Sequence, residues 1–299
     1  MWYKYIMRTN VILAPYTTYK IGGPADYFFE AHSVDEISLA VAEAQQKNVP
    51  YLVLGSGANV LVRDKGYRGI VILNRADKFE FDGNVLRAES GAVLADLIGE
   101  CQKRGLSGLE HFAGIPSTLG GALWQNVHFL SPDRKETVYI ADLLESADLL
   151  DKDGTLRTVG REAFNFGYDQ SLLRDNPELV AVRATLKLMP LDPNEIAERI
   201  KANLEWRAER QPDVVEFPSC GSVFKKIEGV GAGRLIDKAG LKGHRIGGAQ
   251  ISEQHANFIV NRGGATAADV IAMIKLVQEK VKETTGYDLE PEIRLIGEN

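Results

Sequence analysis

Hydrophobic residues recur along the chain with two spacings, and each spacing predicts a different kind of element. The helical spacing of three and four residues occurs over residues 33–47, 93–104, 192–210 and 266–286. The first and last of these begin at capping boxes, Ser33 with Glu36 and Thr266 with Asp269. We therefore expect four amphipathic helices.

Short apolar or alternating runs predict strands between these helices. They lie at residues 27–30, 51–54, 60–62, 69–73, 179–188, 256–261 and 293–296. Two hairpins are expected, 79–81 with 85–88 and 145–150 with 155–159, turned at Asp82-Gly83-Asn84 and Asp153-Gly154. The order of elements predicts an α+β protein with three parts: residues 1–67, residues 68–190 and, after the Pro190–Pro193 boundary, residues 191–299.

The most unusual stretch is residues 111–126, which contains Gly114, Pro116, Gly120 and Gly121. Glycine costs conformational entropy and proline lacks an N–H, so we expect neither a comfortable helix nor a strand here. Glycines let backbone N–H groups approach a ligand closely. A tight buried connection between two elements is an equally good interpretation of this run alone.

Two further glycine stretches favour the ligand interpretation. Residues 51–62 pass from an apolar strand into Gly55-Ser56-Gly57-Ala58-Asn59, and Gly22-Gly23-Pro24 lies upstream. The second stretch lacks the Rossmann spacing and a Walker lysine, and a simple hairpin turn remains an alternative. Together the three stretches predict one large ligand with several phosphates.

Composition excludes several classes of protein. The net charge of −6 argues against broad nucleic-acid or membrane binding, and no stretch is long and apolar enough to span a bilayer. Residues 1–16 lack the apolar run of a signal peptide. Two cysteines, Cys101 and Cys220, fit a reducing cytoplasm better than a disulfide framework.

Three other stretches could carry chemistry. Cys220 lies among serines, but a nucleophilic cysteine would need a nearby histidine such as His244 or His255. Glu292 follows Pro291 at the start of the last strand, where a glutamate is more often solvated or paired with an arginine. Residues 164–174 are either a functional loop or the edge of a hairpin.

Taken together, seven segments resemble the UDP-N-acetylenolpyruvoylglucosamine reductase (MurB) family, in its shorter form. They occur in family order over nearly the whole chain. The segments are Tyr16–Ala25, Leu54–Leu61, Ala113–Ala122, Ser219–Lys225, Ala232–Ile236, His255–Asn261 and Leu289–Arg294.

This resemblance implies an FAD-binding fold of the vanillyl-alcohol-oxidase type in two subdomains, followed by an α/β substrate domain. It implies an enzyme with non-covalent FAD that uses NADPH to reduce an enolpyruvyl UDP-sugar, in the cytoplasm, as a monomer or weak oligomer. Ser222 matches the family's proton donor and Glu292 its catalytic carboxyl residue, whereas Tyr168, Lys225 and His255 match substrate-binding positions. The implied FAD-binding residues are Ile21, Gly22, Gly55, Ser56, Gly57, Ala58, Asn59, Val60, Gly114, Ile115, Pro116, Ser117, Gly120, Gly121, Ala122 and Asn126.

The chain departs from the family at several of these places. Asp169 stands where the family has a catalytic arginine, and an aspartate cannot offer a guanidinium group to a carboxylate. Arg174 is a possible substitute. Ser117, Lys226 and the run Trp124–His128 also differ from the common pattern. Two alternatives therefore stay open: a flavoenzyme of the same fold with another substrate, and a non-catalytic FAD-binding protein.

Overall fold

The computed structural model describes residues 7–227 and 229–298, which fall into two compact units. The first unit comprises residues 27–56 and 69–207 with Met7 and Arg8. The second comprises the described residues of 9–26, 57–68 and 208–299. The chain thus passes between the units more than once, and the predicted boundaries at residues 67 and 190 stay predictions.

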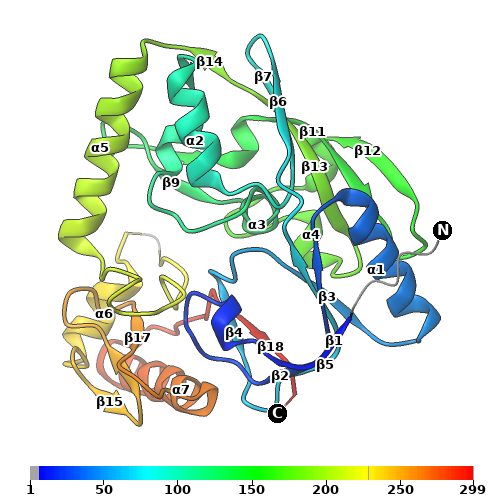
Figure 1. The fold of residues 1–299 in the computed structure, drawn as a ribbon. Coiled ribbons are helices and arrows are strands. Elements are labelled where there is room, and N and C mark those ends of the chain that lie inside the picture. Colours follow the sequence, from blue (N-terminus) through cyan, green and yellow to red (C-terminus); the bar gives the residue numbers. More distant parts are fainter. Residues whose placement is uncertain (1–6, 228, 299) are drawn as a thin grey trace. The chain divides into compact units, whose positions relative to one another are not determined.

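An antiparallel sheet forms the middle of the first unit (Figure 1). Both predicted hairpins are confirmed within it. Its strands follow the order β12 (Leu156–Gly160), β11 (Leu144–Leu150), β13 (Val180–Lys187), β7 (Val85–Glu89) and β6 (Phe79–Asp82). Leu86 and Leu186 on one face pack with α2 (Leu94–Lys103) and α3 (Leu119–Gln125).

The other face of this sheet packs against α1 (Val34–Gln46). Val180 and Val182 of β13 join Ile37 and Val41 of α1 in one core cluster, because alternate residues of a strand point to opposite faces. The same cluster contains residues of β2 (Pro24–Ala31) and β5 (Tyr67–Asn74), and β5 pairs in parallel with β3 (Tyr51–Leu54).

The core of the second unit lies under its long C-terminal helix, α7 (Ala267–Thr285). The predicted capping box is confirmed, and Gly286 ends the helix with a φ of +78°. Against α7 pack α6 (Ala232–Lys238) and a sheet of β15 (Arg245–Ile246), β16 (Ala249–Ile251) and β17 (Ile259–Asn261). A separate parallel pair joins β4 (Val60–Val62) to β18 (Arg294–Ile296).

Several elements differ from the sequence prediction, among them two helices. Residues 119–125 of the glycine run form a helix, because Thr118 caps it by accepting a hydrogen bond from the Gly121 N–H. The helix contains Gly120 and Gly121. The backbone of Gly120 lies close to Ser90, and a Cβ on Gly120 would be 3.0 Å from the Ser90 Cβ, so the close packing favours glycine there. The helix α6 was not predicted, because Gly231 at its start supplies no side-chain cap.

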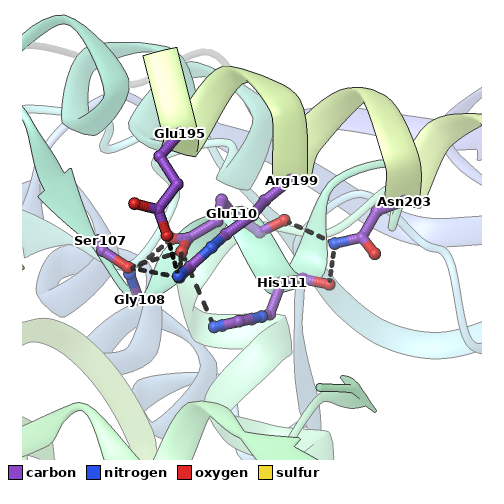
Figure 2. A network of polar contacts seen from close by, with 7 residues as sticks. All are labelled: Ser107, Gly108, Glu110, His111, Glu195, Arg199 and Asn203. Carbon is purple, nitrogen blue, oxygen red and sulfur yellow. Dashed lines mark hydrogen bonds and ion pairs between the residues drawn. The ribbon is translucent and has the colours of Figure 1, made fainter. Parts of the chain in front are cut away.

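The predicted helix after Pro190 is confirmed as α5 (Pro193–Arg210). A polar network holds it to the 3-10 helix η2 (Leu109–Phe112), as Figure 2 shows. Arg199 of α5 lies 3.1 Å from Glu110, and Asn203 donates to the backbone oxygen of Glu110 at 3.1 Å. The helix is thus fixed to the first unit by buried polar contacts as well as by apolar packing.

The remaining elements are short. They are β1 (Arg8–Ile12), β8 (Leu106–Ser107), β9 (His128–Leu130), β10 (Thr137–Tyr139), β14 (Met189–Pro190), α4 (Leu172–Asp175) and the 3-10 helices η1 (Ala14–Tyr16), η3 (Ile140–Asp142) and η4 (Arg161–Phe164). Within the described residues, no helix is long and apolar enough to cross a membrane.

Candidate cofactor and substrate site

The second glycine stretch, Gly55–Asn59, contacts the residues just before Gly22-Gly23-Pro24. These contacts lie inside the second unit. Gly57 has a φ of +63°, and a Cβ on it would lie 2.4 Å from the backbone oxygen of Tyr16. The Thr18 N–H donates to the Gly57 oxygen at 3.2 Å. Only glycine fits this conformation and this close approach.

The other end of the second glycine stretch contacts the glycine run of residues 111–126, which we call the central run. This contact lies inside the first unit. A Cβ on Gly55 would lie 2.3 Å from Oγ1 of Thr118, the residue that caps α3. The Leu119 and Gly120 N–H groups donate to the backbone oxygens of Ala92 and Ser90, both at 2.8 Å. These bonds fix the backbone of the central run.

Between these two contacts, the backbone of the second stretch offers donors for a ligand. Among the hydrogen bonds of the described residues, none uses the N–H of Ser56, Gly57 or Ala58. Gly57 is nevertheless buried. Successive N–H groups of this kind suit a phosphate or pyrophosphate, so these residues fit the FAD that the sequence implies.

The central run also borders a partly buried cation that the sequence analysis did not single out. A Cβ on Gly114 would lie 3.0 Å from Cδ of Arg207 on α5. Desolvation lowers the pKa of Arg207 to about 10. Its position in an amphipathic helix gave no sign of this contact. A cation in this position suits an anionic ligand group.

The two predicted catalytic residues lie on neighbouring segments of the second unit. The Val223 oxygen, next to Ser222 in the chain, accepts from the Glu292 N–H at 2.8 Å. The Lys225 N–H donates to the Glu290 oxygen at 2.9 Å, which continues the pairing. The structure therefore pairs the backbone segments that carry Ser222 and Glu292, which are far apart in the sequence.

The same segment also reaches the second glycine stretch. The Arg294 N–H donates to the backbone oxygen of Asn59 at 3.0 Å, and β18 continues beside β4 from there. Glu292 is thus two residues from a direct contact with a predicted FAD-binding residue.

Asn257, which the sequence analysis did not single out, holds the Ser222 segment in place. Its side-chain oxygen accepts from the Phe224 N–H at 3.0 Å, and its amide donates to the Phe224 oxygen at 2.8 Å. The neighbouring His255, a predicted substrate-binding residue, accepts from the Asn257 N–H through Nδ1 at 3.2 Å. Burial lowers the pKa of His255, so its imidazole is neutral at pH 7.

The other predicted residues of the second unit are Lys225 and the alternative nucleophile Cys220. Lys225 forms an ion pair with Glu290. Burial raises the pKa of the Cys220 thiol, and the Glu292 carboxylate raises it further. A thiol in this environment stays protonated and is a poor nucleophile, which argues against the cysteine-hydrolase alternative.

Two of the departures from the family pattern, Asp169 and the run Trp124–His128, lie together in the first unit. The Gln125 side chain donates to Oδ1 of Asp169 at 2.8 Å, and His128 Nδ1 lies 3.8 Å from the same oxygen. Asn126, at the end of α3, donates to the Gly167 oxygen at 2.9 Å. The ring of Tyr168 lies against the ring of His128, with 4.6 Å between the centroids and an angle of 45° between the ring planes. The departures are therefore parts of one arrangement.

Comparison with known proteins shows which family the chain resembles. Residues 211–296 match the family model of the UDP-N-acetylenolpyruvoylglucosamine reductase C-terminal domain, and residues 25–160 match an FAD binding domain. The reductase of Rubrobacter xylanophilus is 42% identical, with 96% of this chain and 94% of that protein covered. The reductase of Geobacter metallireducens is 43% identical, with 96% and 92% covered.

The chain belongs to the UDP-N-acetylenolpyruvoylglucosamine reductase family. The crystal structure of the family member from Thermus caldophilus superposes with a TM-score of 0.82 at 36% identity, over 97% of this chain and all of that one. Membership of the reductase family confirms the predicted fold class, the FAD-binding part and the C-terminal domain. The individual site residues stay predictions.

Proposed function

We propose that the protein is an FAD-dependent reductase that converts UDP-N-acetylenolpyruvoylglucosamine to UDP-N-acetylmuramate with NADPH, in peptidoglycan synthesis. The observation that carries the proposal lies within the second unit. The Ser222 segment pairs with Glu292, and Arg294 bonds to Asn59 of the cofactor stretch. Family membership supplies the reaction, and this contact supplies the residues that could perform it.

The bound FAD supplies hydride transfer, from NADPH to the enolpyruvyl double bond. Hydride addition to an enol ether conjugated with a carboxylate leaves an enol-like intermediate of the substrate, which needs a proton on the adjacent carbon. We assign this proton to the Ser222 hydroxyl. Glu292, paired beside it, orients the enol or passes the proton on.

The cofactor is held by backbone rather than by side-chain charge. The N–H groups of Ser56, Gly57 and Ala58 are available to the pyrophosphate, and the central run from Gly114 to Ala122 is fixed close by Gly55. No convincing flavin-attachment motif is present, so we expect acid precipitation to release FAD from the polypeptide. Lys225 and His255 are proposed to bind the UDP-sugar.

Where the protein works is inferred from its chemistry. Both cysteines among the described residues are unpaired, as expected in a reducing compartment. We therefore place the enzyme in the cytoplasm, as a monomer or weak oligomer. Its product would contribute to the cell wall, and through it to cell shape and cell division.

The test is anaerobic reduction of the purified yellow protein by NADPH, followed by addition of the enolpyruvyl UDP-sugar. We expect bleaching of the flavin absorbance by NADPH and its return on addition of the substrate. Reduction without re-oxidation would favour the second candidate, a flavoenzyme for another substrate, which the replacement at Asp169 suggests. Absence of bound flavin, with no binding of added FAD, would overturn both.

A further inference from the structure

A cavity of about 350 Å³ lies between α5 and the turn that joins β9 to β10, within the first unit. Ligand sites usually measure about 300–1,000 Å³, so this one is large enough for a small metabolite. Its lining comes from Pro132 and Arg134 of the turn and from five residues of α5. None of the residues predicted to bind cofactor or substrate is among them.

Two of the lining residues form a fixed wall of this cavity. Arg199 pairs with Glu110 at 3.1 Å and with Glu195 at 2.6 Å, and the Asn203 amide donates to the Glu110 backbone oxygen at 3.1 Å (Figure 2). Because the Arg199 guanidinium already has two carboxylate partners, its charge is balanced. The charges that a ligand could use therefore belong to other lining residues.

Arg134 supplies a positive charge that is not balanced in this way. The described residues give its guanidinium no ion pair and one long hydrogen bond, from Nη2 to the Ala202 backbone oxygen at 3.4 Å. Its Nη1 atom is buried and has no hydrogen-bond partner among them. The guanidinium lies 5.6 Å from the ring centroids of Phe129 and Trp206, which hold it without satisfying its N–H groups. A buried donor without a partner is unusual, and a small turn toward an acceptor in the cavity would satisfy it.

Glu198 supplies the opposite charge. Its side chain is exposed on α5 beside Arg199, and no hydrogen bond or ion pair of the described part of the chain involves it. Arg134 and Glu198 line the same cavity without pairing with each other, so the cavity offers one cation and one anion. Pro132 and Ala202 add apolar surface between the charged groups. The complementary ligand carries a carboxylate, an ammonium group and a small apolar body.

We propose that this cavity binds a free α-amino acid with an aliphatic side chain. The carboxylate of the amino acid binds the Arg134 guanidinium, its ammonium group binds the Glu198 carboxylate, and its side chain packs on Pro132 and Ala202. A ligand with only a carboxylate would face the charges of Glu195 and Glu198, and a ligand with only an amine would leave Arg134 unsatisfied. The zwitterion is therefore favoured over either.

The experiment is calorimetric titration of the purified protein with L-valine and with two analogues that each lack one charged group, isovalerate and isobutylamine. We expect saturable binding of one L-valine per chain, at least about 10-fold tighter than either analogue, because each analogue loses a hydrogen-bonded charge. The urea midpoint of unfolding should also rise with L-valine concentration, because a ligand that binds the native state stabilises it.

Variants test the two charged groups. Arg134→Gln and Glu198→Gln should each weaken L-valine binding about 10-fold or more, whereas Arg134→Lys keeps the charge and should retain part of the affinity. The matched controls are Lys201→Gln and Glu205→Gln, which change an exposed ion pair of the same helix outside the cavity and should bind L-valine as the wild type does. Circular dichroism and urea unfolding report whether each variant is folded.

Three outcomes would overturn the inference. The first is a wild type that shows no saturable binding of L-valine. The second is isovalerate or isobutylamine binding as tightly as L-valine, which would mean that one charge is enough. The third is undiminished binding in Glu198→Gln, whose exposed side chain can be replaced without disturbing the core. None of these outcomes bears on the proposed reductase reaction, whose two half-reactions are measured without L-valine.

Discussion

Replacing Glu110 should destabilise the first unit strongly, because the Glu110 carboxylate is buried and binds several neighbouring groups. The side chain is 1% exposed and accepts from the Ser107 hydroxyl at 2.6 Å and from the Gly108 N–H at 2.5 Å. Arg199 lies 3.1 Å from the same carboxylate (Figure 2). Glu110→Ala leaves two donors and a partly buried cation without this acceptor.

The expected loss is about 3–5 kcal/mol in the free energy of unfolding, the cost of removing one partner of a buried ion pair. The matched control is Glu195→Gln, which removes the other carboxylate on Arg199. Glu195 is 49% exposed, so this change should cost about 0–1 kcal/mol. Both values are read from urea unfolding followed by circular dichroism, with FAD absorbance as a check of the native state.

The comparison of wild type with Glu110→Gln adds a test by pH. Burial by itself raises the pKa of Glu110, but the hydrogen bonds from Ser107 and Gly108 outweigh it, and the pKa lies below its ordinary value. A lowered pKa stabilises the fold above the unfolded value of about 4.3 and loses that effect as pH falls through the folded value. The wild-type advantage should therefore be constant near neutrality and shrink below about pH 4.

A loss below about 1 kcal/mol for Glu110→Ala would refute this reasoning, because the Ser107 hydroxyl and the Gly108 N–H would lose a buried acceptor and Arg199 its buried partner. Equal losses for Glu110→Ala and Glu195→Gln would also refute it. The pair would then behave as a surface ion pair despite its burial.

Three further predictions follow from the same structure. Gly57→Val should abolish FAD retention, because a side chain here would be forced into a φ of +63° with its Cβ 2.4 Å from the Tyr16 oxygen. Gly121→Val should weaken retention less, since its Cβ would meet Ser117 Oγ at 3.0 Å and Thr118 Oγ1 at 3.5 Å, and equal FAD titrations for the two variants would contradict this. Ser222→Ala should slow re-oxidation of the reduced flavin by substrate about 10²–10⁴-fold and leave flavin reduction by NADPH nearly intact. If stopped-flow shows both half-reactions slowed equally, the serine positions the cofactor. Burial lowers the pKa of His111, and Arg199 lowers it further, so the free energy of unfolding should fall as pH drops below the unfolded pKa of about 6.5. This fall should be smaller in His111→Asn. Urea midpoints that change in parallel for the two proteins from pH 7 to about 5 would contradict it.

Local patterns predicted most of the elements of this protein. The Ser33 cap, the capping box at Thr266 and the turns at Gly83 and Gly154 lie where α1, α7 and the two hairpins begin or turn. At Ser33 the predicted box is only half formed, because the Glu36 side chain accepts from the His32 N–H. These signals work because each is completed by hydrogen bonds between residues close in the chain. One exception is α3, where Thr118 and the packing of Gly120 against Ser90 outweigh the low helix propensity of glycine.

The glycine stretches and the family motifs were also visible in the sequence, together with the ligand class that they favour. What they could not show was which motifs meet. The pairing of Val223 with Glu292, and of Arg294 with Asn59, joins segments that are distant in sequence. Local pattern carries no information on such pairing, because the contact forms only when the core of the second unit is assembled.

The departures from the family pattern show the same division most clearly. The sequence showed that Asp169 replaces the positive charge of the family's arginine. It suggested Arg174 as a substitute because Arg174 is close in the chain. Only the tertiary structure placed His128 beside the Asp169 carboxylate and engaged Arg174 with the loop backbone and Gln125. The sequence determined which groups are present, whereas burial and long-range contacts decided which of them lie together.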